Sequence, residues 1–148
     1  MSAEQPDRGI ASGGAVTRTV AIDALLEAAR QGLDRVQPED LAAEIAAGAL
    51  LVDTRAIEQR QRDGDMPGAL LIDRNVLEWR LDPTSPHRVP GMTDAGRRVV
   101  IVCNQGYSSS LAAATLRQLG LRRATDLEGG YQAWARYTNQ HAEERTQR

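Results

Sequence analysis

The single cysteine of this chain stands where its thiol could act as a nucleophile. Cys103 ends an aliphatic run, residues 99–102, that predicts a buried strand. An Ala/Leu-rich helix is expected shortly afterwards, and the loop between holds Asn104, Gln105, Gly106, Tyr107, Ser108 and Ser109. Backbone N–H groups of such a tight loop converge with the helix N-terminus on one point and form an anion-binding concavity. A thiol there is positioned for nucleophilic attack, and the alternative is a buried structural cysteine.

The loop residues have separable expected roles. Gly106 allows close backbone approach to a bound anion, while Gln105 and Tyr107 shape access to the thiol. Ser108 and Ser109 either donate hydrogen bonds to the anion or cap the helix. No pattern places either histidine as a base for the thiol, so its activation is assigned to the loop amides and the helix N-terminus.

Short aliphatic strands alternate with helical patterns along the chain. Expected strands lie near residues 49–53, 69–72, 99–102 and 124–127, and expected helices include 22–35, 38–48, 57–62 and 109–119. This order predicts an α/β fold: a parallel sheet of about four or five strands with helices on both faces and extra N-terminal helices. Ligands of such sheets bind beyond the carboxyl ends of the strands, where Cys103 is expected. Asn75 is expected to cap a short helix whose Trp79 packs into the fold.

Length and composition predict one globular domain. Of 148 residues, 41% are hydrophobic and 26% charged, with a net charge of −2. We expect a flexible N-terminal segment (1–18), a domain over 19–140 and a polar tail (141–148). The charge balance argues against nucleic-acid or membrane partners. A lone cysteine indicates a cytoplasmic protein; with only two histidines, neither a metal site nor a cofactor is expected.

Four segments in order along the chain resemble motifs of the rhodanese family of sulfurtransferases. They are residues 51–55 (LVDTR), 65–69 (DMPGA), 103–109 (CNQGYSS) and 127–134 (LEGGYQAW), and together they span roughly residues 38 to 138. Each motif alone is weak evidence for the family, whereas the four motifs in this order are specific to it. The resemblance implies a rhodanese-like domain of the single-domain sulfurtransferase type.

The resemblance assigns roles to those residues of this chain that match the family's motifs. The resemblance implies that Cys103 forms a persulfide, taking sulfur from thiosulfate or another small anionic donor. The acceptor would be cyanide or a thiol, either a small molecule or a protein. Structural roles are implied for Asp53, Arg55, Gly129, Gly130 and Trp134.

Two departures from the family pattern bear on activity. Asp65 stands where the family usually has histidine, and Ser108 and Ser109 stand where many members carry an arginine that gathers the anion. Arg74, which follows residues 69–72, is the candidate for the replacement cation, and the alternative is that it forms a surface salt bridge. One alternative is a non-catalytic interaction or regulatory domain. A cysteine-dependent phosphatase or arsenate reductase is less favoured, because the loop is one residue short and Ser109 replaces the phosphate-binding arginine.

Overall fold

A four-stranded parallel sheet forms the centre of the protein in the computed structural model, which describes residues 21–146. The strand order is β2 (Leu70–Leu71), β1 (Leu50–Asp53), β3 (Val99–Val102) and β4 (Ala124–Asp126). All three neighbouring pairs are parallel, which confirms the predicted fold class and strand number. The expected flexible segment, residues 1–18, lies outside the described residues.

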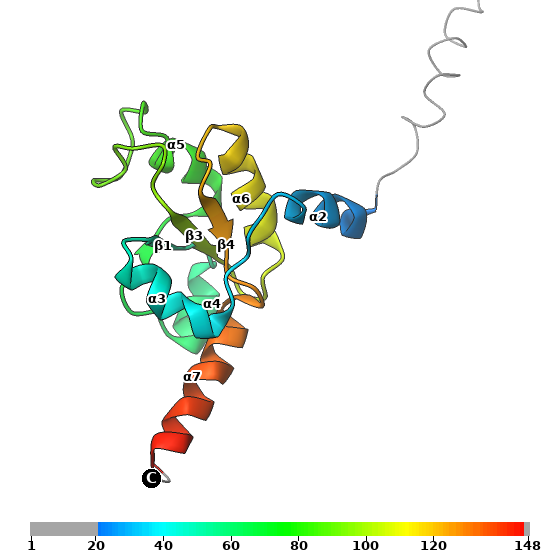
Figure 1. Cartoon of the computed structure of the whole chain (residues 1–148), viewed down its shortest axis with the longest axis vertical. Coiled ribbons are helices and arrows are strands. Elements are labelled where there is room, and N and C mark those ends of the chain that lie inside the picture. Colours follow the sequence, from blue (N-terminus) through cyan, green and yellow to red (C-terminus); the bar gives the residue numbers. More distant parts are fainter. Residues whose placement is uncertain (1–20, 147–148) are drawn as a thin grey trace, which may run out of the picture.

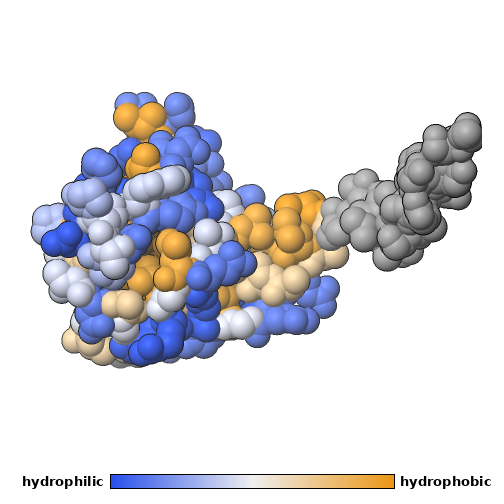
Figure 2. Space-filling model, turned by 90° about the horizontal axis from the view of Figure 1, so that it is seen from above, coloured by the Kyte–Doolittle hydropathy of each residue, from blue (hydrophilic) through white to orange (hydrophobic). Residues whose placement is uncertain are grey.

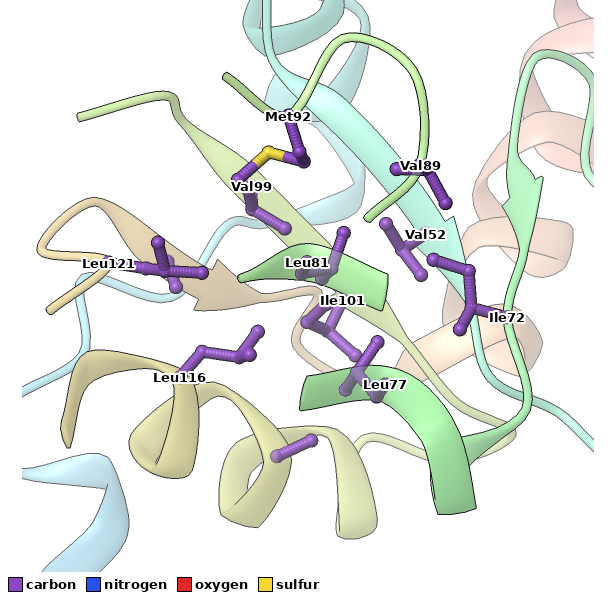
Figure 3. Packing of buried hydrophobic residues seen from close by; sticks show 12 residues of the cluster. Val52, Ile72, Leu77, Leu81, Val89, Met92, Val99, Ile101, Leu116 and Leu121 are labelled. Atoms are coloured by element: carbon purple, nitrogen blue, oxygen red, sulfur yellow. The ribbon is translucent and has the colours of Figure 1, made fainter. Parts of the chain in front are cut away.

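Strand β3 is buried on both faces, as its continuous aliphatic sequence predicts. Val99 and Ile101 point into one hydrophobic cluster, whereas Val100 and Val102 point into another, following the two-residue period of a strand. Figure 3 shows the first cluster, in which Ile101 lies among side chains of helices and of the neighbouring strand. The sheet therefore has a core on each side and holds the end of β3 rigidly.

Different helices cover the two faces. The first cluster is closed by α5 (Leu77–Leu81) and α6 (Ser108–Gln118), the second by α3 (Leu41–Ala46) and the start of α7 (Gly130–Thr146). Three short helices complete the fold: η1 (Pro38–Asp40), α4 (Ile57–Asp63) and η2 (Arg74–Val76). Figure 1 shows α7 extending away from the sheet. Helix α7 continues through the first residues of the expected polar tail, where its side chains are exposed.

Helix α2 (Ile22–Arg30) packs against α6 at the side of the molecule and outside the two layers (Figure 1). It ends before residue 35, the expected end. Only Leu26 is buried, while Ile22 and Leu25 remain exposed. Figure 2 shows hydrophobic residues at the surface next to the grey segment. The helix is thus held to the domain by few apolar side chains, of which only Leu26 is fully buried, and by the polar contacts described below.

Two local expectations are corrected. Trp79 is 58% exposed, because Leu77 and Leu81, one helical turn apart, take the buried face of α5. Asp73, rather than Asn75, caps the preceding turn: its carboxylate accepts the Asn75 N–H at 2.7 Å. Within residues 21–146, no helix has the length and apolar character needed to cross a membrane.

Candidate functional site

Cys103 directly follows β3, and its side chain is nearly enclosed. Two backbone N–H groups donate to its sulfur: Gly106 at 3.2 Å and Ser109 at 3.3 Å. The first belongs to the loop and the second to the opening turn of α6. Donors aimed at one sulfur match a sulfur that carries negative charge, as a thiolate or a persulfide does.

A cavity of about 240 Å³ opens at this sulfur. It is lined by Cys103, Asn104, Gln105, Tyr107 and Ser108 from the loop, and by Thr54, Arg55 and Gln59 from the segment after β1. Among residues 21–146, the backbone N–H groups of Gln105, Tyr107 and Ser108 have no protein acceptor and are available to a ligand. The predicted loop residues therefore come together around the thiol.

Glycines let the turn before α7 lie directly under the loop. Gly106 has φ +83°, and a Cβ there would lie 2.7 Å from the Gly129 nitrogen. Gly130 has φ +63°, and a Cβ there would lie 2.6 Å from the Cys103 carbonyl oxygen. Backbone touches backbone at both places, which requires the absence of a side chain.

The first residues of α7 hold the Cys103 loop in place by hydrogen bonds. Tyr131 N–H donates to the Cys103 carbonyl at 2.8 Å, and Gln132 N–H donates to the Asn104 carbonyl at 3.1 Å. The Gln132 side chain bridges the Asn104 side chain and the Asp63 carboxylate, at 3.0 Å each. A hydrogen bond from Arg62 lowers the pKa of Asp63, so this acceptor stays ionised.

Asp53 and Arg55 form a buried ion pair. Arg55 Nη2 lies 2.8 Å from Asp53 Oδ2 and also donates to the Gly64 carbonyl at 2.9 Å. The guanidinium stacks on the Tyr131 ring at 3.8 Å, and Trp134, partly buried, lies beside that ring at 5.6 Å. The pair joins the end of β1 to α7, and Arg55 also borders the Cys103 cavity.

The structure does not support Arg74 as the replacement cation. Its guanidinium pairs with Glu78 at 2.9 Å, one helical turn later. Arg74 lines a neighbouring cavity of about 340 Å³ and does not line the cavity at Cys103. The cation predicted for the anion site must be sought elsewhere.

Ser109 and Ser108 do not cap the helix either. Tyr107 occupies the N-cap position of α6, and no side chain caps it. The Ser109 hydroxyl donates to Asp126 at 2.7 Å and is therefore committed away from the cavity. Of the polar groups of Ser109, only the backbone N–H donates to the Cys103 sulfur.

Sequence reasoning missed a polar cluster behind the loop. Asp126, the fully buried last residue of β4, accepts hydrogen bonds from the Ser109 and Ser110 hydroxyls, each at 2.7 Å. It also accepts from Arg35 Nε at 2.9 Å. Two guanidinium groups, those of Arg30 and Arg35, donate to the Gly106 carbonyl at 2.7 and 2.9 Å. The sequence held one indication of this cluster: Asp126 lies near the end of a predicted strand, and a buried carboxylate needs polar partners.

The comparisons with known proteins agree with this geometry. The family model of the rhodanese-like domain matches residues 37–137. The chain belongs to the rhodanese-like family. Its matched segment holds the sheet, the loop and the Gly129–Gly130 turn, and it excludes α2, Arg30 and Arg35.

Named relatives of this rhodanese-like chain include a sulfurtransferase from Allochromatium vinosum, 32% identical over 107 residues, covering 71% of this chain and 91% of the relative. A thiosulfate sulfurtransferase, GlpE, from Stutzerimonas stutzeri is 29% identical, covering 68% and 83%. Among solved structures, a Rhodopseudomonas palustris protein of unknown function, described as a possible tyrosine phosphatase, aligns with TM-score 0.73 and 32% identity, covering 82% and 94%. A human single-domain sulfurtransferase aligns with TM-score 0.57 and 26% identity, covering 69% and 95%.

Proposed function

We propose that this protein is a sulfurtransferase that carries a sulfane sulfur on Cys103. The observation that carries the proposal is the pair of N–H donors, from Gly106 and Ser109, directed at Sγ inside a small cavity. The relatives named as sulfurtransferases support the same activity. The site has the parts that a covalent sulfur carrier needs: a nucleophile, donors for its charge and room for a small anion.

In the first step, the Cys103 thiolate attacks the outer sulfur of a donor such as thiosulfate. A new S–S bond forms to Cys103 while the S–S bond of thiosulfate breaks, and its electron pair leaves with sulfite. The product is a cysteine persulfide with one negative charge on the terminal sulfur. The free N–H groups of Gln105, Tyr107 and Ser108 are available to that sulfur and to the departing anion.

In the second step, a nucleophile removes the terminal sulfur. Cyanide gives thiocyanate, and a thiolate gives a new persulfide; in both cases the electrons of the S–S bond return to Cys103 as thiolate. No proton has to be removed from an anionic nucleophile, which fits a cavity without a histidine among its lining residues. We place this chemistry in the cytoplasm, where the thiol acceptors it needs stay reduced.

The proposal is tested by the thiosulfate:cyanide assay, with thiocyanate as the measured product. Wild-type protein should turn over, and Cys103→Ser should not, because a serine hydroxyl is a far weaker nucleophile than a thiolate at neutral pH. Equal thiocyanate production by both proteins would refute the role of Cys103. A wild-type protein inert toward every sulfur donor would favour the non-catalytic interaction domain.

Phosphate-ester hydrolysis is the second candidate, favoured by the likeness to the possible tyrosine phosphatase from R. palustris. Two observations oppose it here. The loop itself contributes no guanidinium, and Arg55, the only arginine bordering the cavity in the described chain, is engaged with Asp53. We therefore expect no release of p-nitrophenol from p-nitrophenyl phosphate above the level of Cys103→Ser.

A further inference from the structure

Two arginines from outside the family-matched segment converge on the loop that holds Cys103. Arg30 is the last residue of α2, and Arg35 lies in the connection after it. Their Nη2 atoms donate to the same Gly106 carbonyl oxygen, at 2.7 and 2.9 Å. The loop's own sequence has no arginine, so these two groups bring positive charge to it from elsewhere in the chain.

Each arginine is fixed at a second point. Arg30 Nε donates to the Ser110 hydroxyl at 3.0 Å, and its guanidinium lies 5.7 Å from the Tyr107 ring centre. Arg35 is paired with Asp126, and this carboxylate offsets its charge. Arg30 forms no direct ion pair with a carboxylate among residues 21–146; the Ser110 hydroxyl lies between its guanidinium and Asp126.

The held carbonyl determines where the next amide points. The peptide bond between Gly106 and Tyr107 is trans, so the Tyr107 N–H is directed opposite to the Gly106 carbonyl. The carbonyl faces the two arginines, and Tyr107 is one of the residues that line the cavity. A cation on the carbonyl also polarises the peptide and strengthens its N–H as a donor.

We propose that Arg30 and Arg35 are positioning residues of the sulfur-transfer site: by holding the Gly106 carbonyl they keep the loop in the conformation in which the Gly106 and Ser109 N–H groups donate to the Cys103 sulfur, and they orient the Tyr107 N–H for the bound anion. Helix α2 thereby completes an active-site loop that lacks its own arginine. Arg30 touches neither the cavity nor the sulfur, so it acts through the Gly106–Tyr107 peptide. This inference rests on the proposed sulfurtransferase function.

The test compares Arg30→Ala and Arg30→Gln with Arg122→Ala. Arg122 is an exposed arginine just before β4, at the end of the sheet opposite Cys103, so its removal changes the net charge equally. The first readout is the rate at which the neutral reagent iodoacetamide alkylates Cys103 as a function of pH. The charged groups that contact the loop or its direct partners are Arg30, Arg35, Asp126, Glu128, Arg55, Asp53 and Asp63, and only the first is altered.

Removing Arg30 should move the midpoint of the alkylation profile upward by about half a pH unit, which slows alkylation about threefold below the midpoint. The kcat/KM for thiosulfate should fall on the order of tenfold, mainly through KM, since the misdirected amides bind the donor anion less well. Arg122→Ala should match wild type in both readouts. Arg30→Gln, which keeps most of the side-chain stem, should show the same shifts if Arg30→Ala does not fold.

A folded Arg30 variant whose alkylation profile and KM both match those of Arg122→Ala would overturn the inference. Alkylation requires no sulfur transfer, so it judges the role of Arg30 even if wild-type protein does not react with thiosulfate. In that case the proposed function fails, while the inferred coupling between α2 and the loop is still decided by the alkylation profiles.

Discussion

Gly130→Ala is the substitution that most directly probes how the fold supports the loop. A Cβ at Gly130 would lie 2.6 Å from the Cys103 carbonyl oxygen, 2.7 Å from the Gly106 nitrogen and 2.8 Å from the Asn104 carbonyl carbon. All three are backbone atoms of the loop and cannot rotate aside. The loop must therefore move as a unit, and the Gly106 N–H that donates to the sulfur must move with it.

The backbone part of the cost can be separated from the contact part. Alanine in a left-handed conformation costs about 1–2 kcal/mol wherever it occurs. Gly68 has φ +78° and no atom within 4 Å of the position that a Cβ would take, so Gly68→Ala isolates this strain. Gly130→Ala carries the strain at φ +63° together with the three close contacts. It should therefore be less stable than Gly68→Ala, by on the order of another 1–3 kcal/mol.

Denaturant unfolding and thiosulfate:cyanide kinetics should be measured on both variants. We expect Gly68→Ala to lose stability while keeping its kcat/KM, and Gly130→Ala to lose stability and at least about tenfold in kcat/KM, the level typical of a misplaced oxyanion donor. Equal stability and equal kcat/KM in the two variants would refute the conclusion that the loop backbone can pack against residue 130 only when that residue has no side chain.

Two further predictions concern buried and surface charge. Asp126→Ala should destabilise the protein by about 3–5 kcal/mol in denaturant unfolding, because it removes the closer carboxylate partner of Arg35 and the acceptor of the Ser109 and Ser110 hydroxyls; a loss below about 1 kcal/mol would contradict this. At Asp34, burial alone would raise the pKa, but hydrogen bonds and charges from Arg98 and Arg117 outweigh it and hold the pKa below 3.8. The stabilisation from Asp34 is therefore complete above pH 3.8 and is lost as the pH falls through the lowered pKa. Asp34→Asn should be less stable than wild type by under about 1 kcal/mol at neutral pH, since the group is largely exposed, and the difference should shrink as the pH falls through the lowered pKa of Asp34. A difference that persists at low pH would contradict the ion-pair explanation.

The sequence was sufficient to predict a parallel sheet of about four or five strands and the position of the loop at Cys103. Continuous aliphatic runs specify buried parallel strands, and the glycines at 129 and 130 follow from a motif with a fixed place in the chain. The predicted packing of Trp79 was wrong because the size of an indole does not decide which face of a helix is buried. The one-turn spacing of Leu77 and Leu81 identifies the buried face of α5 and leaves Trp79 outside it.

The polar cluster behind the loop was not predictable in the same way. Arg30 and Arg35 reach Gly106 across more than 70 residues of sequence, and no local pattern encodes such contacts. For Arg74 a local pattern did exist, because Glu78 lies one helical turn away and favours an i,i+4 ion pair. Strand order correctly placed the Arg74 backbone at the edge of the sheet where Cys103 lies. The ion pair with Glu78, however, holds the Arg74 guanidinium away from the cavity at Cys103.

The most direct test of the central claim is the intact mass of the protein after treatment with thiosulfate. We predict that wild-type protein gains the mass of one sulfur atom, that fragmentation locates it on Cys103, and that cyanide removes it. Cys103→Ser should gain nothing. No mass gain in the wild type, or the same gain in Cys103→Ser, would contradict the proposal that Cys103 carries the transferred sulfur.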